Sequence, residues 1–203
     1  MSLDGPFQTT ARLILASASP RRRILLQDLG LAFETIEAQI EEQPHVGETA
    51  RDFVLRAACD KARAVSRQHV SSWVLAADTV VVHDSRILGK PEDAAQALSV
   101  LLSLAGKKHL VHTAFCLENA NDQVSVGRIV TTEVWFSPFS KDIAASYVAT
   151  GEPLDKAGAY GIQGCGGFLV EKINGSYSNV VGLPMAEVLR ELLRYKVAAP
   201  RQG

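Results

Sequence analysis

Residues 12–23 read Arg-Leu-Ile-Leu-Ala-Ser-Ala-Ser-Pro-Arg-Arg-Arg, and this stretch decides the fold class. Its apolar run, which stops at Ser17, is typical of a short buried strand. Ser19 and Pro20 then have the residue types of a helix N-cap and a first helical position, where the missing N–H of proline costs nothing. The stretch therefore predicts a strand that turns directly into a helix ending at Gly30, as in α/β proteins.

Alternation of strand and helix continues to Gly106, and the second half of the chain adds a hairpin. Apolar periodicity and helix-start signals predict strands at 33–38 and 73–83 and helices at 49–68 and 91–106. They further predict paired strands at 109–118 and 124–137, a helix at 140–151, a strand at 168–173 and a helix at 184–195. We expect an α/β fold with a mixed central sheet flanked by helices, in two lobes around a cleft.

Length and composition are those of a globular protein with a substantial core. The 203 residues are 47% hydrophobic and 21% charged, which is far from the composition of a disordered chain. We expect a single domain over residues 1–203, with flexible ends at 1–11 and 197–203. Residues 1–10 lack the pattern of a signal peptide, and no apolar stretch approaches the roughly 20 residues that cross a bilayer. The sequence thus predicts no membrane association.

Net charge and cysteine content argue against two classes of protein. The formal net charge is −1, from 21 basic and 22 acidic side chains, which argues against a protein that binds nucleic acid through bulk charge. Any anion site must therefore be local. Cys59, Cys116 and Cys165 lie far apart and form no CxxC pair, which argues against a disulfide framework. This pattern fits a reducing compartment, so we expect a cytoplasmic protein.

The start of the first predicted helix has the residues of an anion site. Free backbone N–H groups and the helix dipole favour negative charge there. Ser17 and Ser19 add hydroxyl donors, and Arg21 and Arg22 add guanidinium groups that match phosphate oxygens. The alternative is a capped helix with a solvated basic first turn, but arginines at this end oppose the dipole and need another reason to be there. Because GxxxxGK[ST] is absent, the site is not a P-loop.

Asp78 interrupts an apolar strand. A buried carboxylate without a partner is costly, so Asp78 has a cationic partner, binds a metal or lines a cleft. Lys61 and Lys90 are the candidate partners, and Lys61 lies on the packed face of its predicted helix. Lys90 precedes a helix that begins with proline, where a cation can hold an anion. Thr79 points to the face opposite Asp78 or, if the strand ends there, toward the same ligand.

Two adjacent acids suggest a metal site. Glu41 and Glu42 stand in a loop and mean little alone, but together with Asp78 they offer oxygen ligands. Mg²⁺ and Mn²⁺ usually take one or two carboxylates plus the phosphates of a substrate. We therefore regard a divalent cation as the candidate cofactor.

The segment 155–167 contains five glycines in thirteen residues. Such a density implies positive φ angles or a close approach of backbone to a ligand. Gln163 offers a donor and an acceptor on one planar group, which suits the edge of a nucleobase. An elaborate turn before a strand is the alternative, and the residues alone leave both readings open.

These motifs resemble, in the same order, those of the Maf family. The matching stretches run from about Arg12 to about Leu193 and comprise residues 15–22, 41–42, 61–63, 77–81, 89–91, 155–164 and 177–184. The resemblance implies a two-lobed α/β fold related in shape to the inosine triphosphatases. It also implies an enzyme that cleaves a nucleoside triphosphate between its α and β phosphates, giving a monophosphate and pyrophosphate.

Residue by residue, the resemblance makes Asp78 the proton acceptor that activates water. Glu42, with Glu41 beside it, would hold the divalent metal together with Asp78. The residues that would bind the triphosphate are Ser17, Ser19, Arg22, Lys61 and Lys90.

Three positions resemble the branch of the family that acts on dTTP and UTP: Arg21, Thr79 and Gln163. Modified pyrimidine nucleotides are also plausible substrates of that branch. Two alternatives stay open, a 7-methyl-GTP pyrophosphatase that differs in its base pocket and a nucleotide-binding regulator of cell division that acts without turnover. Family members are often dimers, so the resemblance allows a homodimer.

Overall fold

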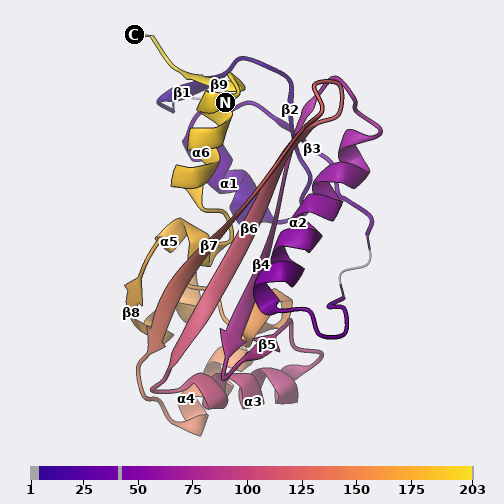
Figure 1. Cartoon of the computed structure of the whole chain (residues 1–203). Coiled ribbons are helices and arrows are strands. Elements are labelled where there is room, and N and C mark those ends of the chain that lie inside the picture. The colour runs from indigo at the N-terminus through magenta and orange to yellow at the C-terminus, as the bar shows by residue number, and fades with distance from the viewer. Residues whose placement is uncertain (1–4, 41–42, 203) are drawn as a thin grey trace. The chain divides into compact units, whose positions relative to one another are not determined.

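The chain forms two units, and each of the three long strands seen in Figure 1 has residues in both. The computed structural model describes residues 5–40 and 43–202. The first unit comprises Met1–Asp78, Thr113–Ile129 and Gly182–Gly203, and the second comprises Thr79–His112 and Val130–Val181. The three long strands are β4 (Trp73–His83), β6 (Lys108–Asn119) and β7 (Val124–Phe136). This division matches the two lobes expected from the sequence.

Parallel and antiparallel strands share one sheet. Its strand order is β3–β2–β4–β6–β7–β8, with β5 (Arg86–Leu88) paired to β4. β2 (Leu13–Leu15) is parallel to both β3 (Glu34–Thr35) and β4, whereas β8 (Val170–Asn174) is antiparallel to β7. The predicted mixed sheet with flanking helices is therefore confirmed.

Apolar side chains from strands and helices form the core of the first unit. Its helices are α1 (Pro20–Asp28), α2 (Ala50–Ser66) and α6 (Met185–Arg194). Leu15, Leu26, Leu75, Phe115 and Leu192 are buried together in one cluster. Burial of a leucine or phenylalanine side chain contributes about 1.5–3 kcal/mol, so this cluster fixes β2 and α1 against the other elements.

The second unit has its own core and contains the glycine-rich segment. Its helices are α3 (Ala94–Leu104), α4 (Lys141–Val148) and α5 (Tyr177–Val181), with 3₁₀ turns η1 (Glu152–Asp155), η2 (Ala157–Ala159) and η3 (Cys165–Leu169). His109 lies 2.8 Å from the hydroxyl of Tyr160 and packs edge-on against Phe136. Burial lowers the pKa of His109 to about 3, so this histidine is a neutral core residue.

Helix starts predicted from capping residues are confirmed at two helices. The Thr49 hydroxyl accepts a hydrogen bond from the backbone N–H of Asp52 at 3.2 Å, and Ser140 does the same for Ile143. The third helix begins later than predicted, at Ala94 instead of Pro91, because the Asp93 carboxylate caps it by accepting from the N–H of Gln96 at 2.7 Å.

Three other boundaries were predicted wrongly. The predicted strand 33–38 is only β3, the helix 140–151 ends at Val148, and the strand 168–173 begins at Val170 after a 3₁₀ turn. The ends of the chain also differ from the expectation of flexible segments at 1–11 and 197–203. Within them β1 (Phe7–Thr9) pairs antiparallel with β9 (Ala198–Pro200), and this pairing supplies the order that their sequences do not signal.

Within residues 5–40 and 43–202, no helix combines the length and the apolar character that crossing a bilayer requires.

Candidate active site

A buried ion pair joins β4 to α2 in the first unit. The Nζ atom of Lys61 lies 2.7 Å from Oδ1 of Asp78, and each residue is only 8% exposed. Lys61 reaches this place because it shares a buried stripe of α2 with Ala57 and Val65, at a spacing of one helical turn. Of the two candidate partners predicted for Asp78, Lys61 is confirmed.

Stability alone does not account for this pair. Removing two charges from water costs several kcal/mol per ion, and apolar residues of similar volume would pack there at least as well. Asp78 offers a carboxylate that can accept a proton or hold a cation, and Lys61 keeps a positive charge beside it. Such a pair in an apolar setting is a candidate for catalysis.

The polar residues that follow β2, like Asp78 of β4, lie beyond the stretch where these two strands pair. Leu13–Leu15 pair in parallel with Trp73–Leu75, and the N–H of Ala16 donates to the carbonyl of Leu75. Ser17 lies two residues beyond this paired stretch, and Asp78 lies three residues beyond it, within β4, which continues to His83. Ser17 thus follows the carboxyl end of β2, the position at which α/β proteins place their ligands.

Ser17 organises the start of α1. Its Oγ atom accepts hydrogen bonds from the backbone N–H of Ser19 and from Nη1 of Arg22, both at 3.2 Å. Arg22 is fixed further because its Nε donates to the carbonyl of Gly182 at 2.7 Å. The Ser17 oxygen accepts these two hydrogen bonds, and the hydroxyl hydrogen can be donated to an anion.

Ser19 occupies the predicted N-cap position of α1, but its side chain makes no capping hydrogen bond. The first turn contains no acidic residue, and Arg21 is half-buried within it. Backbone N–H groups, the helix dipole and the arginines therefore all favour an anion here. The structure thus brings Ser17, Ser19 and Arg22 together at the start of α1, and the anion site there stays a prediction.

The second unit contains three of the predicted positions, Thr79, Lys90 and Gln163. β4 continues past Thr79 to His83, so Thr79 points to the face of the strand opposite Asp78, as the first of the two alternatives expected. Lys90 is exposed, and the preceding carbonyl of Gly89 accepts from the N–H of Gly158 at 3.1 Å. This bond ties the loop of Lys90 to the glycine-rich segment.

Gln163 is exposed within the glycine-rich segment, between η2 and η3. One glycine of the segment is required by its surroundings, because Gly158 has a φ of 70° and a Cβ there would lie 2.8 Å from a methyl group of Val81. The segment is therefore closely packed at Gly158 and exposed to solvent at Gln163.

Glu41 and Glu42, the other proposed metal ligands, lie outside the described residues. Within the part of the chain that the structure describes, no group of three or more histidine, cysteine, aspartate or glutamate side chains is arranged to hold a metal ion. Asp78 nevertheless fits a role as one ligand. A carboxylate has two oxygens, so Asp78 can bind Lys61 through Oδ1 and still offer an oxygen to a cation.

Sequence reasoning missed the side chains that hold the glycine-rich segment. Tyr147 of α4 and Glu152 of η1 bond to its backbone. Their signal in the sequence is weak, since their partners are backbone N–H groups that any residue would supply.

Comparison with known proteins agrees with the motifs. The family described as Maf-like protein matches residues 12–195, which is most of the chain. The chain belongs to the Maf family. Among curated proteins, this Maf chain is 52% identical to the dTTP/UTP pyrophosphatase of Desulfotalea psychrophila over 185 residues, covering 91% of this chain and 95% of that protein. It is 47% identical to the dTTP/UTP pyrophosphatase of Myxococcus xanthus over 188 residues, covering 93% and 94%.

A solved structure supports the fold of this Maf protein. The Ham1 protein of Staphylococcus aureus matches it with a TM-score of 0.51, covering 91% of this chain and 99% of that chain. The two sequences are 12% identical, so the likeness concerns the fold.

Proposed function

We propose that this Maf protein is a nucleoside triphosphate pyrophosphatase that cleaves dTTP and UTP between the α and β phosphates. The products are the nucleoside monophosphate and pyrophosphate. The observation that carries the proposal is the buried Asp78–Lys61 pair on β4, next to strand β2, whose carboxyl end leads into Ser17 and Arg22. The relatives named dTTP/UTP pyrophosphatase, at about half identity over nearly the whole chain, support the reaction class.

Asp78 acts as the proton acceptor in this reaction. It takes a proton from the attacking water while the bond between the α and β phosphates breaks and pyrophosphate departs. Lys61 holds the Asp78 carboxylate in place through the 2.7 Å contact. Neutralising the roughly four negative charges of a triphosphate is most of the catalytic work. We assign that task to Ser17, Ser19, Arg22, Lys61 and Lys90.

A divalent cation, Mg²⁺ or Mn²⁺, is part of the proposal. Asp78 would hold it together with Glu42, and Glu41 stands beside Glu42 as a further oxygen ligand. When bound, the cation supplies positive charge to the phosphate oxygens.

Base choice is assigned to Arg21, Thr79 and Gln163. Gln163→Ala is expected to raise KM for UTP about tenfold and to weaken discrimination against other bases, with a smaller effect on kcat, because the amide contacts the base and not the reacting phosphates. Steady-state kinetics with UTP and CTP checks this. Gln27→Ala, an exposed glutamine on α1, is the matched control. An unaltered base profile in Gln163→Ala would remove Gln163 from recognition.

The reaction itself is tested by pyrophosphate release from dTTP, UTP, CTP, GTP, ATP and 7-methyl-GTP, with Mg²⁺ or Mn²⁺. We expect release from dTTP and UTP at kcat/KM values at least about a hundredfold above those for the other nucleotides, since mispaired polar groups in a base site are costly. Preference for 7-methyl-GTP would keep the reaction but contradict the assigned base site. Absence of release from every nucleotide would favour the regulator that binds without turnover.

Several broader properties belong to the same proposal. We infer one functional domain over residues 1–203, acting in the cytoplasm without nucleic acid, as a monomer or homodimer. The free state of Cys59, Cys116 and Cys165 supports the compartment. The net charge of −1 supports the absence of nucleic acid.

A further inference from the structure

Two side chains of the second unit hold both ends of the loop that presents Gln163. The carboxylate of Glu152 accepts hydrogen bonds from the N–H of Cys165 at 3.0 Å, through Oε2, and from the N–H of Gly166 at 3.1 Å, through Oε1. The hydroxyl of Tyr147 donates to Oε1 of Glu152 at 2.8 Å and accepts from the N–H of Gly161 at 3.2 Å. The loop is thus tied at residue 161 and at residues 165–166.

Tyr147 and Glu152 have the protonation states that their hydrogen bonds require. Burial and the neighbouring carboxylate of Glu152 raise the pKa of Tyr147, which keeps its hydroxyl a donor. Burial alone would raise the pKa of Glu152, but the hydrogen bonds from Tyr147, Gly166 and Cys165 outweigh it and hold that pKa below its ordinary value. A charged carboxylate that accepts from backbone N–H groups forms stronger hydrogen bonds than a neutral group.

Gly164 and Gly166 leave free the space that the side chains of Glu152 and Tyr147 occupy. A Cβ at Gly164, whose φ is 111°, would lie 3.0 Å from Oε2 of Glu152. A Cβ at Gly166 would overlap the hydroxyl of Tyr147. Since only glycine allows this approach without displacing the acceptors, the loop is built around Glu152 and Tyr147.

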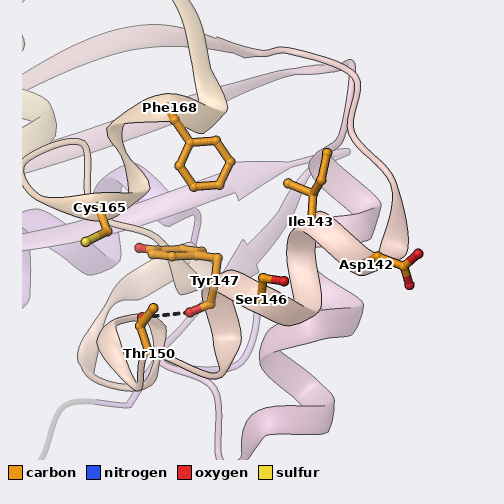
Figure 2. Close-up of a pocket in the computed structure, with 7 residues that line it drawn as sticks. All are labelled: Asp142, Ile143, Ser146, Tyr147, Thr150, Cys165 and Phe168. Atoms are coloured by element: carbon orange, nitrogen blue, oxygen red, sulfur yellow. Dashed lines mark hydrogen bonds between the residues drawn. The ribbon is translucent and has the colours of Figure 1, made fainter.

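Tyr147 is itself rigid. It is 2% exposed on α4, and its ring meets that of Phe168 edge-on at a centroid distance of 6.0 Å. Figure 2 shows its hydroxyl end directed toward Cys165, along a pocket of about 400 Å³ that Ile143 and Phe168 also line. A buried ring on a helix is a fixed support for a loop.

We propose that Glu152 and Tyr147 are positioning residues that set the base selectivity of this enzyme by fixing Gln163; this inference rests on the proposed function. Gln163 stands midway between the anchored residues Gly161 and Cys165, and it is exposed. An exposed amide on an untied loop would have to be ordered anew by each nucleotide, at a cost in binding. With both flanks held, the amide meets the base in one orientation, so a base with the wrong donor and acceptor pattern is rejected.

The test combines Glu152→Gln and Tyr147→Phe with hydrogen exchange and kinetics. Glutamine keeps the size of Glu152 but replaces one acceptor oxygen with a donor that faces a backbone N–H. Phenylalanine removes only the hydroxyl of Tyr147. In Glu152→Gln we expect at least about tenfold faster exchange at the amide of Cys165 or Gly166 that faces the new NH₂ group, because that amide loses its acceptor. In Tyr147→Phe we expect the same increase at the amide of Gly161.

In kinetics, both variants should raise KM for dTTP and UTP about tenfold, leave kcat within about twofold and reduce the preference for UTP over CTP. Glu171→Gln, an exposed glutamate on β8, should change neither exchange nor kinetics. Circular dichroism melting shows whether each variant is folded, and Tyr147→Phe keeps the test available if Glu152→Gln is not. A loss that falls on kcat with KM unchanged would contradict a positioning role and indicate general damage.

A role of Glu152 and Tyr147 in base choice and the proposed pyrophosphatase activity are contradicted by different results. If Gln163→Ala alters base choice while Glu152→Gln and Tyr147→Phe keep it, this inference is wrong and the proposed function stands. If exchange at Gly161, Cys165 and Gly166 is unchanged in the variants, the anchoring itself is wrong. Wild-type protein that releases no pyrophosphate overturns both.

Discussion

Asp78→Asn should lower kcat for pyrophosphate release from dTTP and UTP by about a thousandfold, within the range by which a general base accelerates a reaction. Asparagine has the size of aspartate and keeps an oxygen that can accept from Lys61, so the packing of β4 against α2 survives. Its amide cannot take a proton from water, and it is a weaker ligand for a divalent cation. Single-turnover and steady-state release of pyrophosphate measure the loss.

Asp28→Asn is the matched control for this variant. Asp28 is an exposed carboxylate at the end of α1, in the same unit, and its change should leave turnover within about twofold, as for most surface substitutions. Thermal unfolding of Asp78→Asn within a few degrees of wild type would show that the fold is retained. Turnover of Asp78→Asn comparable to that of the wild type would exclude Asp78 as the proton acceptor.

The pairing of Asp78 with Lys61 could be predicted from the sequence, because burying a charge without a partner costs free energy. A carboxylate in an apolar strand demands a partner, and helical spacing places Lys61 on a buried face. The turn from strand to helix that contains Ser17 and Arg22 could also be predicted, because the apolar run stops at Ser17 and Ser19-Pro20 is a helix start, whereas the anion expected there stays a prediction. Both inferences use local residue types and need no knowledge of distant contacts.

Contacts distant in the sequence were not predictable in this way. β1 and β9 are three residues each and lie at opposite ends of the chain, so neither has a pattern long enough to signal a strand. The start of α3 was wrong by three residues because Pro91 and Asp93 are both ordinary helix-start signals, and only the bond to Gln96 decides between them. Glu152 was missed because its acceptor role depends on how a glycine-rich loop folds back onto it.

Lys61→Met is expected to destabilise the protein by about 3 kcal/mol, the cost of leaving one member of a buried ion pair without its partner. Methionine keeps the apolar length of the lysine stem, so the loss comes from the charge of Asp78 and little from packing. Urea unfolding at neutral pH measures the change. Turnover should fall as well, because Lys61 both orients Asp78 and binds the triphosphate in the proposed mechanism. Lys107→Met, an exposed lysine, is the control.

The double variant Lys61→Met with Asp78→Asn separates the two roles of the pair. Removing both charges eliminates the unpaired carboxylate, so stability should return to within about 1 kcal/mol of wild type, as replacement of buried pairs by neutral groups often does. Turnover should stay as low as in Asp78→Asn. Recovery of stability without activity would mean that the pair is retained for its chemistry, because the fold does not need it. If the double variant is instead as unstable as Lys61→Met, the packing of Lys61 and not the charge of Asp78 accounts for the loss, and the pair is a structural feature of α2 and β4.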